Sequence, residues 1–572
     1  PGDIAGARAA EAITRTLGVP LTVLSGTDPH GVAAAVADRL QHTVVVLTST
    51  SPTSTSLATD SHRRAYLQAF EDHGIHDLGR RFVFVTVPGS PLATTALEMG
   101  AQLFLAQPGA LSAFSLVPAG LAGADIRDLV EQAFALAEPP RRTAGPAGFA
   151  LPSTGFAPAV SLPAATPSTG SHAGGPGHPA VALGSALAAA VDAGRDKFAL
   201  APDGSGIVGL GEWVAALLAA SGPDATGLAT SGPGASGFGG SGSGASGPGA
   251  SGPGASGPGA SGPGASGPGA SGLPGLGLPG SRPTGSGFTA AGPADSGATD
   301  AGAADSGPAD AGAGGAGAGG VGSRAVAVVL ETPSSWGHEG PDVLSVTIGG
   351  ALVPGIMPGG GIAPDLAVNG PLGAQLLAWE QALTIAGLIR PAGPAGAGRP
   401  SSQEGVLRVL DTGLPPQAPQ FVDGAVEVHG AIAATTLIGA VDEFARAVPP
   451  GAILAVHAHL DRTGDAAALA LRTELAGRVN RAVTFAWGGE AVQPAAGIGG
   501  AGGTPAVMTI QITGAVTEDL RVPGRPYTFG ELQAAEAADD RQALLDRGRP
   551  LLRLHLTDRT SGIDQLLAAL GG

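Results

Sequence analysis

The sequence contains no cysteine, and Lys197 is the only lysine among its 29 basic residues. The absence of cysteine excludes disulfide bonds, thiolate metal sites and cysteine nucleophiles. Aromatic residues are also scarce, at 4% of the 572 residues, so any core must be packed mainly with alanine, valine and leucine. We attribute the shortage of lysine to a preference for GC-rich codons, which carries no functional information.

Basic residues are outnumbered by acidic ones, and the formal net charge is -17. This balance argues against a nucleic-acid partner, because such a partner requires a basic surface that neutralises its phosphates. It leaves room for a small anionic ligand, since a few backbone N–H groups suffice to hold one phosphate.

Long apolar runs are also missing. The sequence has no uninterrupted apolar run of about 18 residues, the length that a membrane span requires, so we expect no membrane partner. Its first residues, PGDIAGARAAEAI, lack a basic segment followed by an apolar one. We therefore expect no signal peptide. They also lack an initiator methionine, and we expect an N-terminus that is processed or shortened.

Residues 18–137 alternate apolar runs with helical patterns, and VPLTVLSG, HTVVVLTS and RRFVFVTVPG read as strands. A helix is predicted to begin at Asp28, an N-cap residue followed by Pro29, and another to be closed by Gly74. Such alternation with continuous apolar strands is typical of an α/β fold with a doubly wound, mostly parallel sheet in three αβα layers. Ligands of these sheets bind at the C-terminal ends of the strands.

The same alternation returns after residue 324, in strand patterns such as GAILAVHAHL, AVMTIQITG and LLRLHLTD. Before it, the block SGPGASGPGAS repeats with a period of five residues, which is not the period of collagen, and its lack of apolar bulk predicts disorder. The predicted organisation is a first α/β domain at 1–138, a flexible Pro/Ala/Ser-rich insert at 139–179, a helical continuation of the first domain at 180–221, a disordered low-complexity linker at 222–323, and a second α/β domain with C-terminal helices at 324–572.

The stretch TSPTSTSLATDSHRRAY, residues 50–66, follows a strand pattern and leads into a helix. Hydroxyl groups together with the N–H groups of a helix N-terminus are what a phosphate dianion uses. The alternative is an ordinary Ser/Thr-rich loop that caps the helix. The sequence leaves both readings open.

This stretch belongs to a set of segments that resemble the glucose-6-phosphate isomerases, specifically their actinobacterial branch. Others in the set are VTVPGSPLATTALEMG, SAFSLVPAGLAGADI, GPLGAQLLAWEQALTIAG and TEDLRVPGRPYTFGELQAAEAADDRQALLDRGRPLLRLHLTD. The resemblance implies two sugar-isomerase (SIS) domains and a cytosolic homodimer. It also implies the interconversion of glucose 6-phosphate and fructose 6-phosphate in glycolysis and gluconeogenesis, without metal or cofactor, so the expected partner is a phosphorylated hexose.

The resemblance assigns the phosphate loop of the family to residues 51–59. The hydroxyl positions that survive there, and that we predict to bind the substrate phosphate, are Ser51, Thr53, Thr55, Ser56 and Thr59.

The other positions of this loop have changed. Pro52 stands where relatives have a lysine, which removes a charge and a backbone N–H together. Ser54 replaces a glycine, which penalises any positive φ, and Ala58 replaces a glutamate. The predicted phosphate site is therefore a weakened one.

The catalytic groups of the family have no counterparts that we can place, and we assign no catalytic residue. Relatives carry an arginine just before SAFSLVP, whereas here FLAQPGALSAFSLVP runs straight through, with only the neutral Gln107 nearby. Loss of such a charge-stabilising donor typically costs on the order of 10²–10³ in rate. Only Ser221 remains of a Glu-Ser-x-Gly-Lys motif, and neither Glu331 nor Glu339 has motif support as the base.

For three further candidate site residues we favour a structural role over a catalytic one. Glu380 falls on the helix that matches relatives, where a structural or interface carboxylate is expected. His457 and His459 sit in a strand pattern and are expected to belong to the core or surface and not to an acid/base pair. Ala501 stands at the position of a lysine in relatives.

Segments that form the core match the family, while nearly every site motif is altered. The first reading is a glucose-6-phosphate isomerase with weak or lost activity. The second is a non-catalytic SIS-domain protein that binds a sugar phosphate or has a regulatory role. The third is a structural protein that partners an intact isomerase subunit.

Overall fold

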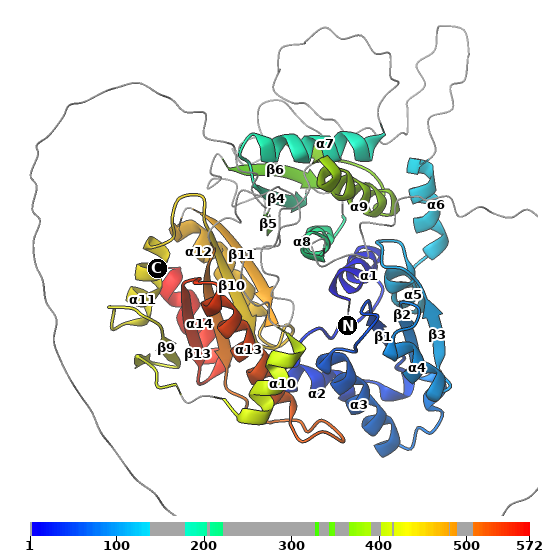
Figure 1. Cartoon of the computed structure of the whole chain (residues 1–572), viewed down its shortest axis with the longest axis horizontal. Coiled ribbons are helices and arrows are strands. Elements are labelled where there is room, and N and C mark those ends of the chain that lie inside the picture. The colour runs from blue at the N-terminus through cyan, green and yellow to red at the C-terminus, as the bar shows by residue number, and fades with distance from the viewer. Residues whose placement is uncertain are drawn as a thin grey trace, which may run out of the picture. The chain divides into compact units, whose positions relative to one another are not determined.

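A computed structural model describes residues 3–137, 178–202, 206–220, 327–330, 342–348, 365–389, 402–414, 417–479, 481–488 and 507–571 (Figure 1). The predicted linker at 222–323 lies outside these residues, as do most of the insert predicted at 139–179 and the positions of Ser221, Glu331, Glu339 and Ala501. Within the described residues the chain is α/β, with helices interleaved between strands that pair mostly in parallel.

The N-terminal part contains a three-stranded parallel sheet in the order β1-β2-β3. Its strands are β1 (Val45–Ser49), β2 (Phe82–Thr86) and β3 (Gln102–Leu105). The helices of this part are α1 (Ile4–Leu17), α2 (Pro29–Ala37), α3 (Leu57–Asp72), α4 (Pro91–Glu98), α5 (Ala113–Leu121) and α6 (Ile126–Ala137), with short 3₁₀ helices η1 (Leu40–His42) and η2 (Leu78–Arg80). The predicted start of α2 is confirmed, because the Asp28 carboxylate accepts hydrogen bonds from the N–H groups of His30 and Gly31 and Pro29 opens the helix.

The predicted strand at VPLTVLSG does not form, and residues 19–27 have no regular secondary structure. Pro20 lacks an N–H for a strand ladder. Other groups of this segment bond elsewhere: the Gly26 carbonyl lies 3.0 Å from His62 Nε2, and Thr27 Oγ1 donates to Glu536. The segment therefore serves as a connector that touches distant helices.

A second, four-stranded sheet of parallel strands has the order β5-β4-β6-β7. It consists of β4 (Lys197–Pro202), β5 (Ala327–Leu330), β6 (Val343–Ile348) and β7 (Leu366–Val368), accompanied by α7 (Pro179–Asp192), α8 (Leu210–Ala220) and α9 (Leu372–Ile389). The segment predicted to be helical at 180–221 therefore contains two helices, and the apolar KFALAP between them becomes a strand. This strand pairs with strands that follow the low-complexity linker in sequence.

The largest sheet has six strands in the order β11-β10-β12-β13-β9-β8. The first four are parallel, and β9 and β8 continue the sheet antiparallel. The strands are β8 (Phe421–Asp423), β9 (Val426–His429), β10 (Ile453–His459), β11 (Ala482–Trp487), β12 (Val507–Gly514) and β13 (Leu551–Leu556). The associated helices are α10 (Gln403–Thr412), α11 (Leu437–Arg446), η4 (Ala466–Ala470), α12 (Leu471–Val479), α13 (Phe529–Asp546) and α14 (Arg559–Leu570).

The two faces of this sheet differ in chemistry because its strands alternate apolar and polar residues. One face carries residues such as Leu454, Ile510 and Leu554, which are buried in one core cluster with side chains of α11, α12 and α14. The opposite face carries an apolar cluster of Ile453, Ala455, Ala482 and Val507 at the start of the strands. Toward the C-terminal ends of the strands it is polar and lies under α13, where Gln511 Nε2 donates to the Ala537 carbonyl at 2.8 Å. A buried polar face of this kind requires internal partners or a ligand.

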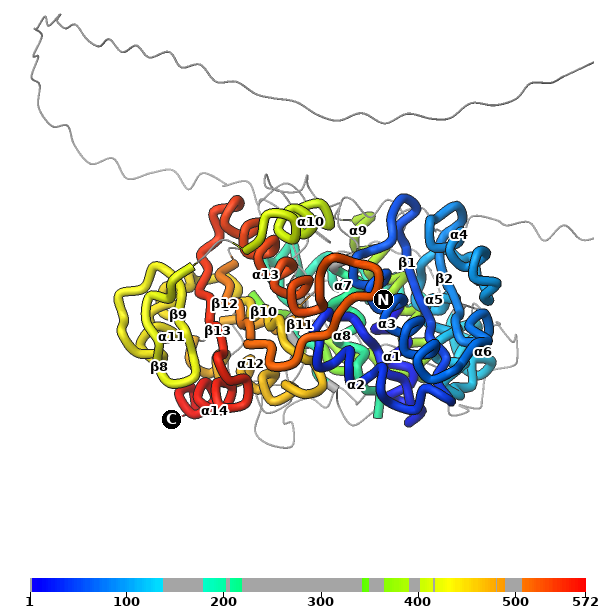
Figure 2. Tube along the Cα trace, turned by 90° about the horizontal axis from the view of Figure 1, so that it is seen from below, coloured from blue at the N-terminus to red at the C-terminus, as the bar shows by residue number. Residues whose placement is uncertain are grey.

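The N-terminal and C-terminal segments of the described chain share a hydrophobic cluster. Its buried members include Val32 of α2, Ala65 of α3, Val406 of α10 and Phe529 of α13. The ring of His62 also stacks on Phe529, with centroids 5.7 Å apart. Figure 2 shows α10 running beside α13 on this side of the sheet. This packing fixes α13 against the polar sheet face.

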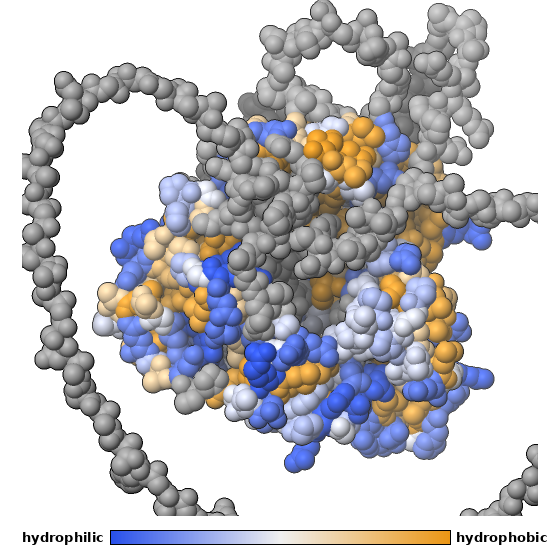
Figure 3. Space-filling view, viewed as in Figure 1, coloured by the Kyte–Doolittle hydropathy of each residue, from blue (hydrophilic) through white to orange (hydrophobic). Residues whose placement is uncertain are grey.

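Of the described helices, α9 is long and apolar enough to cross a membrane by length and composition alone. It is 56% buried inside the structure, where Leu376 and Trp379 belong to the main core cluster. Burial of this extent is typical of a core helix in a globular protein. Figure 3 shows hydrophobic side chains exposed over α7, the neighbour of α9, where Val181 is 46% exposed.

Candidate functional site

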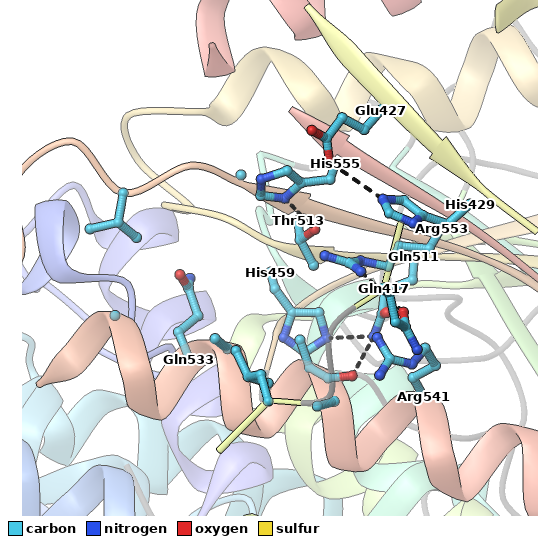
Figure 4. A pocket seen from close by; sticks show the side chains of 17 residues that line it. Gln417, Glu427, His429, His459, Gln511, Thr513, Gln533, Arg541, Arg553 and His555 are labelled. Atoms are coloured by element: carbon cyan, nitrogen blue, oxygen red, sulfur yellow. Dashed lines mark hydrogen bonds and ion pairs between the residues drawn. The ribbon is translucent and has the colours of Figure 1, made fainter. Parts of the chain in front are cut away.

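A pocket of about 280 Å³ lies between the polar face of the six-stranded sheet and α13 (Figure 4). It opens where β10, β12 and β13 approach their C-terminal ends, the edge at which parallel sheets bind ligands. We call it the His/Arg pocket. Its polar lining consists of Gln417, Glu427, His429, His459, Gln511, Thr513, Gln533, Arg541, Arg553 and His555.

The sheet contributes this lining as two rows of neighbouring residues that run across four strands. In the outer row, the strand register places four residues side by side: His459, Thr513, His555 and Glu427. One step further into the sheet, the neighbours are His457, Gln511, Arg553 and His429. Since residues of one strand face the same side at every second position, both rows point toward α13.

Two guanidinium groups give the pocket its charge. Arg541 rises from α13, and no carboxylate within the described residues forms an ion pair with it. Arg553 donates to the neutral Oε1 of Gln417 at 3.3 Å. Burial lowers the pKa of Arg541, and burial together with the charge of Arg541 lowers the pKa of Arg553, against the opposing effect of Glu427. Two cations that repel each other in a partly buried site form an environment that favours an anion.

The histidines of the pocket are held in their neutral form. Burial and the positive charge of Arg553 lower the pKa of His429, against the opposing effect of Glu427. The same two causes lower the pKa of His555, whose Nδ1 lies 2.9 Å from Thr513 Oγ1. Burial lowers the pKa of His459 to about 3. These rings therefore act as neutral hydrogen-bonding groups at neutral pH.

Several buried polar atoms on this face of the sheet, including some on the pocket-lining residues His459 and Gln511, have no hydrogen-bond partner in the described structure. They are Nδ1 of His457, Nδ1 of His459, Oγ1 of Thr509 and Oε1 of Gln511. His459 Nε2 lies 3.5 Å from both Asp540 Oδ2 and Gln511 Nε2. Unsatisfied groups gathered on one sheet face are costly in a purely structural layer and are commonly found where a ligand or water binds.

The predicted phosphate loop lies at the C-terminal end of β1 and leads into α3. Ser51 Oγ accepts the N–H groups of Thr53 and Ser54, at 3.4 and 3.2 Å. Ser56 is the N-cap of α3, where it accepts the N–H of Thr59 at 3.1 Å and donates to its hydroxyl at 2.7 Å. Thr53 is exposed and Thr55 is half-buried, so the loop combines a capping role with hydroxyls that solvent can reach.

One carboxylate and three guanidinium groups lie next to this loop. Asp60 lies in the first turn of α3, and its carboxylate pairs with Arg63, Arg64 and Arg525 at 2.6–2.7 Å. Although burial opposes it, these three partners lower the pKa of Asp60 to about 2. One carboxylate balances only one of the three guanidinium groups, so this cluster keeps a net positive charge, while Asp60 itself competes with any phosphate for the helix N-terminus. Phosphate binding by this loop stays a prediction, and its geometry favours the capping role.

Replacing Ser56 by alanine should lower the free energy of unfolding by about 1 kcal/mol, the usual cost of removing an N-cap side chain. Urea unfolding of the variant measures this loss. Ser54→Ala in the same loop is the matched control and should have little effect, because the Ser54 hydroxyl bonds to the Ser51 hydroxyl, at 3.2 Å, in an exposed position. Equal stabilities of the two variants would rule out the capping role.

Other residues singled out from sequence have mainly structural surroundings. Glu380 on α9 accepts the N–H of Ala110 at 3.0 Å, and burial raises its pKa. This supports its structural reading. His457 is buried in the sheet as expected, whereas His459 also lines the His/Arg pocket.

A set of polar contacts beside the pocket holds α13 against the N-terminal segment. Asp28 Oδ2 pairs with Arg559 at 2.7 Å and accepts from Gln533 at 3.0 Å. Thr27 Oγ1 donates to Glu536 at 2.6 Å. Burial and the charge of Asp540 raise the pKa of Glu536 to about 7, although Thr27 acts in the opposite direction. Gln533 therefore links the pocket lining to the N-cap of α2.

The sequence patterns do not locate the pocket, although they carry a signal for it. The strands that build it read VHAHL, TIQITG, LRLHL and VEVH, and each alternates apolar residues with polar or charged ones. That period-two pattern predicts a sheet with one apolar and one polar face. The sequence alone does not show that these four strands are neighbours in one sheet, since β9 precedes β13 by more than a hundred residues.

The chain matches no protein-family model and no curated protein. One solved structure with partial similarity is that of a hypothetical protein from Thermus thermophilus, at 18% sequence identity. The similarity covers 39% of this chain and 47% of that protein, with a TM-score of 0.28. The chain thus spans about half the length of that protein, and a likeness at this level supports no conclusion about function.

Proposed function

We propose that this chain binds a phosphorylated hexose in the His/Arg pocket and has weak or no glucose-6-phosphate isomerase activity. The observation that carries the proposal is the pocket itself: a cavity of about 280 Å³ with two arginines, three histidines and neutral hydrogen-bonding groups. Its volume is near the lower end of the range of about 300–1,000 Å³ for ligand pockets. Cations suit the phosphoryl group, and the amide, hydroxyl and imidazole groups suit sugar hydroxyls.

The same lining argues for weak catalysis. Isomerisation requires a base that moves a proton between two sugar carbons, and Glu427 is the one carboxylate among the described residues that line the pocket. Its Oε2 lies 3.5 Å from His429 Nε2, and the neutral ring makes no hydrogen bond through that atom in the described structure. The altered family motifs point the same way. The alternative within this proposal is a non-catalytic SIS-domain protein that binds or senses a sugar phosphate. In either case we propose a cytoplasmic homodimer.

Calorimetric titration with glucose 6-phosphate and fructose 6-phosphate tests binding, and we expect a dissociation constant in the micromolar to millimolar range with a rise in melting temperature. A coupled assay that converts fructose 6-phosphate to glucose 6-phosphate tests catalysis, and the rate should stay close to that of heat-inactivated protein.

The variant Thr53→Val/Thr55→Val serves as the control for the predicted phosphate loop, since it removes two hydroxyls and leaves the Ser56 cap intact. Unchanged affinity in this variant is expected if the ligand occupies the His/Arg pocket. Absence of binding by either hexose phosphate would overturn the proposal, and a high isomerase rate would overturn its second half.

A further inference from the structure

The geometry points to a dianion subsite between Arg541 and Arg553, at which binding is accompanied by proton uptake on His429 and His555. This inference deepens the proposed function and rests on it in part, because it names the groups that receive the phosphoryl moiety and a pH dependence that the pocket imposes. It also stands for any small tetrahedral dianion, of which sulfate and hydrogen phosphate are the simplest.

The first argument concerns the positive charge of Arg541 and Arg553. Arg541 and Arg553 come from α13 and β13 and line one cavity, and within the described chain neither forms an ion pair with a carboxylate. Their partial burial and the repulsion that Arg541 exerts on Arg553 are unfavourable for the free protein, and Glu427 in the same cavity offsets only part of this. A dianion would relieve both effects, because charge-assisted hydrogen bonds from guanidinium groups to oxyanions are among the strongest in proteins.

The second argument concerns the neighbours of Arg553 in the sheet. His429 is its direct partner on β9, and His555 follows two residues later on the same face of β13. Arg553 opposes the protonation of both rings, and Glu427 favours it. Protonated His429 and Arg559 further oppose the protonation of His555, so the two rings compete for one proton. An anion bound at Arg553 cancels this repulsion and adds an attraction of its own, so the pKa values of both histidines must rise on binding.

The sign of the pH dependence follows from linkage. If the complex binds more protons than the free protein, affinity must increase as pH falls through the range where the histidines titrate. His459 contributes little to this effect, because its burial at the base of the pocket holds its pKa near 3. The linkage should therefore be concentrated on the two rings that flank Arg553.

Sulfate is the probe of choice, since it stays a dianion throughout the range studied. Calorimetric titration of the full chain with sodium sulfate, in two buffers of different ionisation enthalpy at pH 7, measures the number of protons taken up. We expect binding with uptake of up to about one proton, and tighter binding at pH 6 than at pH 8. Arg541→Gln and Arg553→Gln should each weaken sulfate binding by about ten- to a hundredfold, and Arg553→Gln should also abolish proton uptake.

Arg80→Gln is the matched control, because it makes the same change of charge at a side chain that is 86% exposed. It should leave sulfate binding unchanged. Thermal unfolding of each variant checks folding, and neither pocket variant should lose stability, since both remove a cation that has no carboxylate partner among the described residues.

The results separate this inference from the proposed function. Sulfate binding that depends on both arginines, without any binding of hexose phosphates, would support the subsite and overturn the proposed ligand. Hexose-phosphate binding that is unaffected by Arg541→Gln and Arg553→Gln would overturn the subsite. Binding without proton uptake, or no sulfate binding at all, would likewise contradict the inference.

Discussion

Replacing Lys197 by methionine should lower the free energy of unfolding by about 3 kcal/mol or more, the usual cost of breaking a buried ion pair from one side. The sole lysine of the chain is 1% exposed at the start of β4. Its Nζ donates to Asp196 and to Asp342, both at 2.6 Å, and these carboxylates are 1% and 23% exposed. Removing the ammonium leaves negative charges in a poorly solvated site between β4 and the strand that follows Asp342.

Urea unfolding of the full chain measures the loss. Adding Asp342→Asn to Lys197→Met removes one of the two carboxylate charges and should recover part of the lost stability. Arg80→Met is the matched control, because the Arg80–Asp77 pair is exposed and should be worth less than about 1 kcal/mol. If Lys197→Met cost no more than this control, the buried triad would not be a stabilising element.

Replacing Glu536 by glutamine should raise stability at pH 8 by about 2 kcal/mol and have little effect at pH 4. In the folded chain the pKa of Glu536 is raised from 4.5 to about 7, chiefly by burial. The folded state therefore binds more protons than the unfolded state between these two values, and stability falls as pH rises through that window. Above it the full cost of a buried carboxylate is present, and glutamine avoids that cost while its carbonyl can still accept from Thr27.

Thermal unfolding from pH 4 to pH 8 tests this prediction, with the difference in stability between the variant and the parent chain as the readout. Glu71→Gln makes the same chemical change at an exposed position of α3 and should show no such pH dependence. A constant difference between Glu536→Gln and the parent across the whole range would show that folding does not shift the pKa of Glu536.

Most strands and helices of the described chain follow from local sequence patterns. The apolar runs of β1, β2, β10, β12 and β13 are recognisable because parallel strands are buried on both faces or alternate cleanly. The start of α2 is equally clear from Asp28 and Pro29. VPLTVLSG does not become a strand because an apolar run forms one only if a neighbouring strand pairs with it, and pairing is a tertiary property. The same reason explains why the local pattern does not predict β4 as a strand, because its partner strands lie beyond the low-complexity linker.

The candidate site divides in a similar way. Residues 51–59 can be identified because their pattern is contiguous, and the structure places Ser56 at the helix cap that the alternative reading expects. The His/Arg pocket draws one or two residues from each of several distant segments. His429 and Arg553, for example, become neighbours only through the pairing of β9 with β13. A pattern on one strand can show that a face is polar, but not which other faces meet it.

The alternation of the strands beneath the pocket also constrains folding. Because side chains alternate with a period of two, a slip of one residue in β13 would bring Arg553 and His555 into the apolar layer and Leu552 and Leu554 under α13. Such a misaligned sheet would bury charge without partners on one side and expose the core on the other. The polar rows that we assign to a ligand therefore also discriminate between correct and shifted strand pairing, and the binding function and the fidelity of assembly depend on the same side chains.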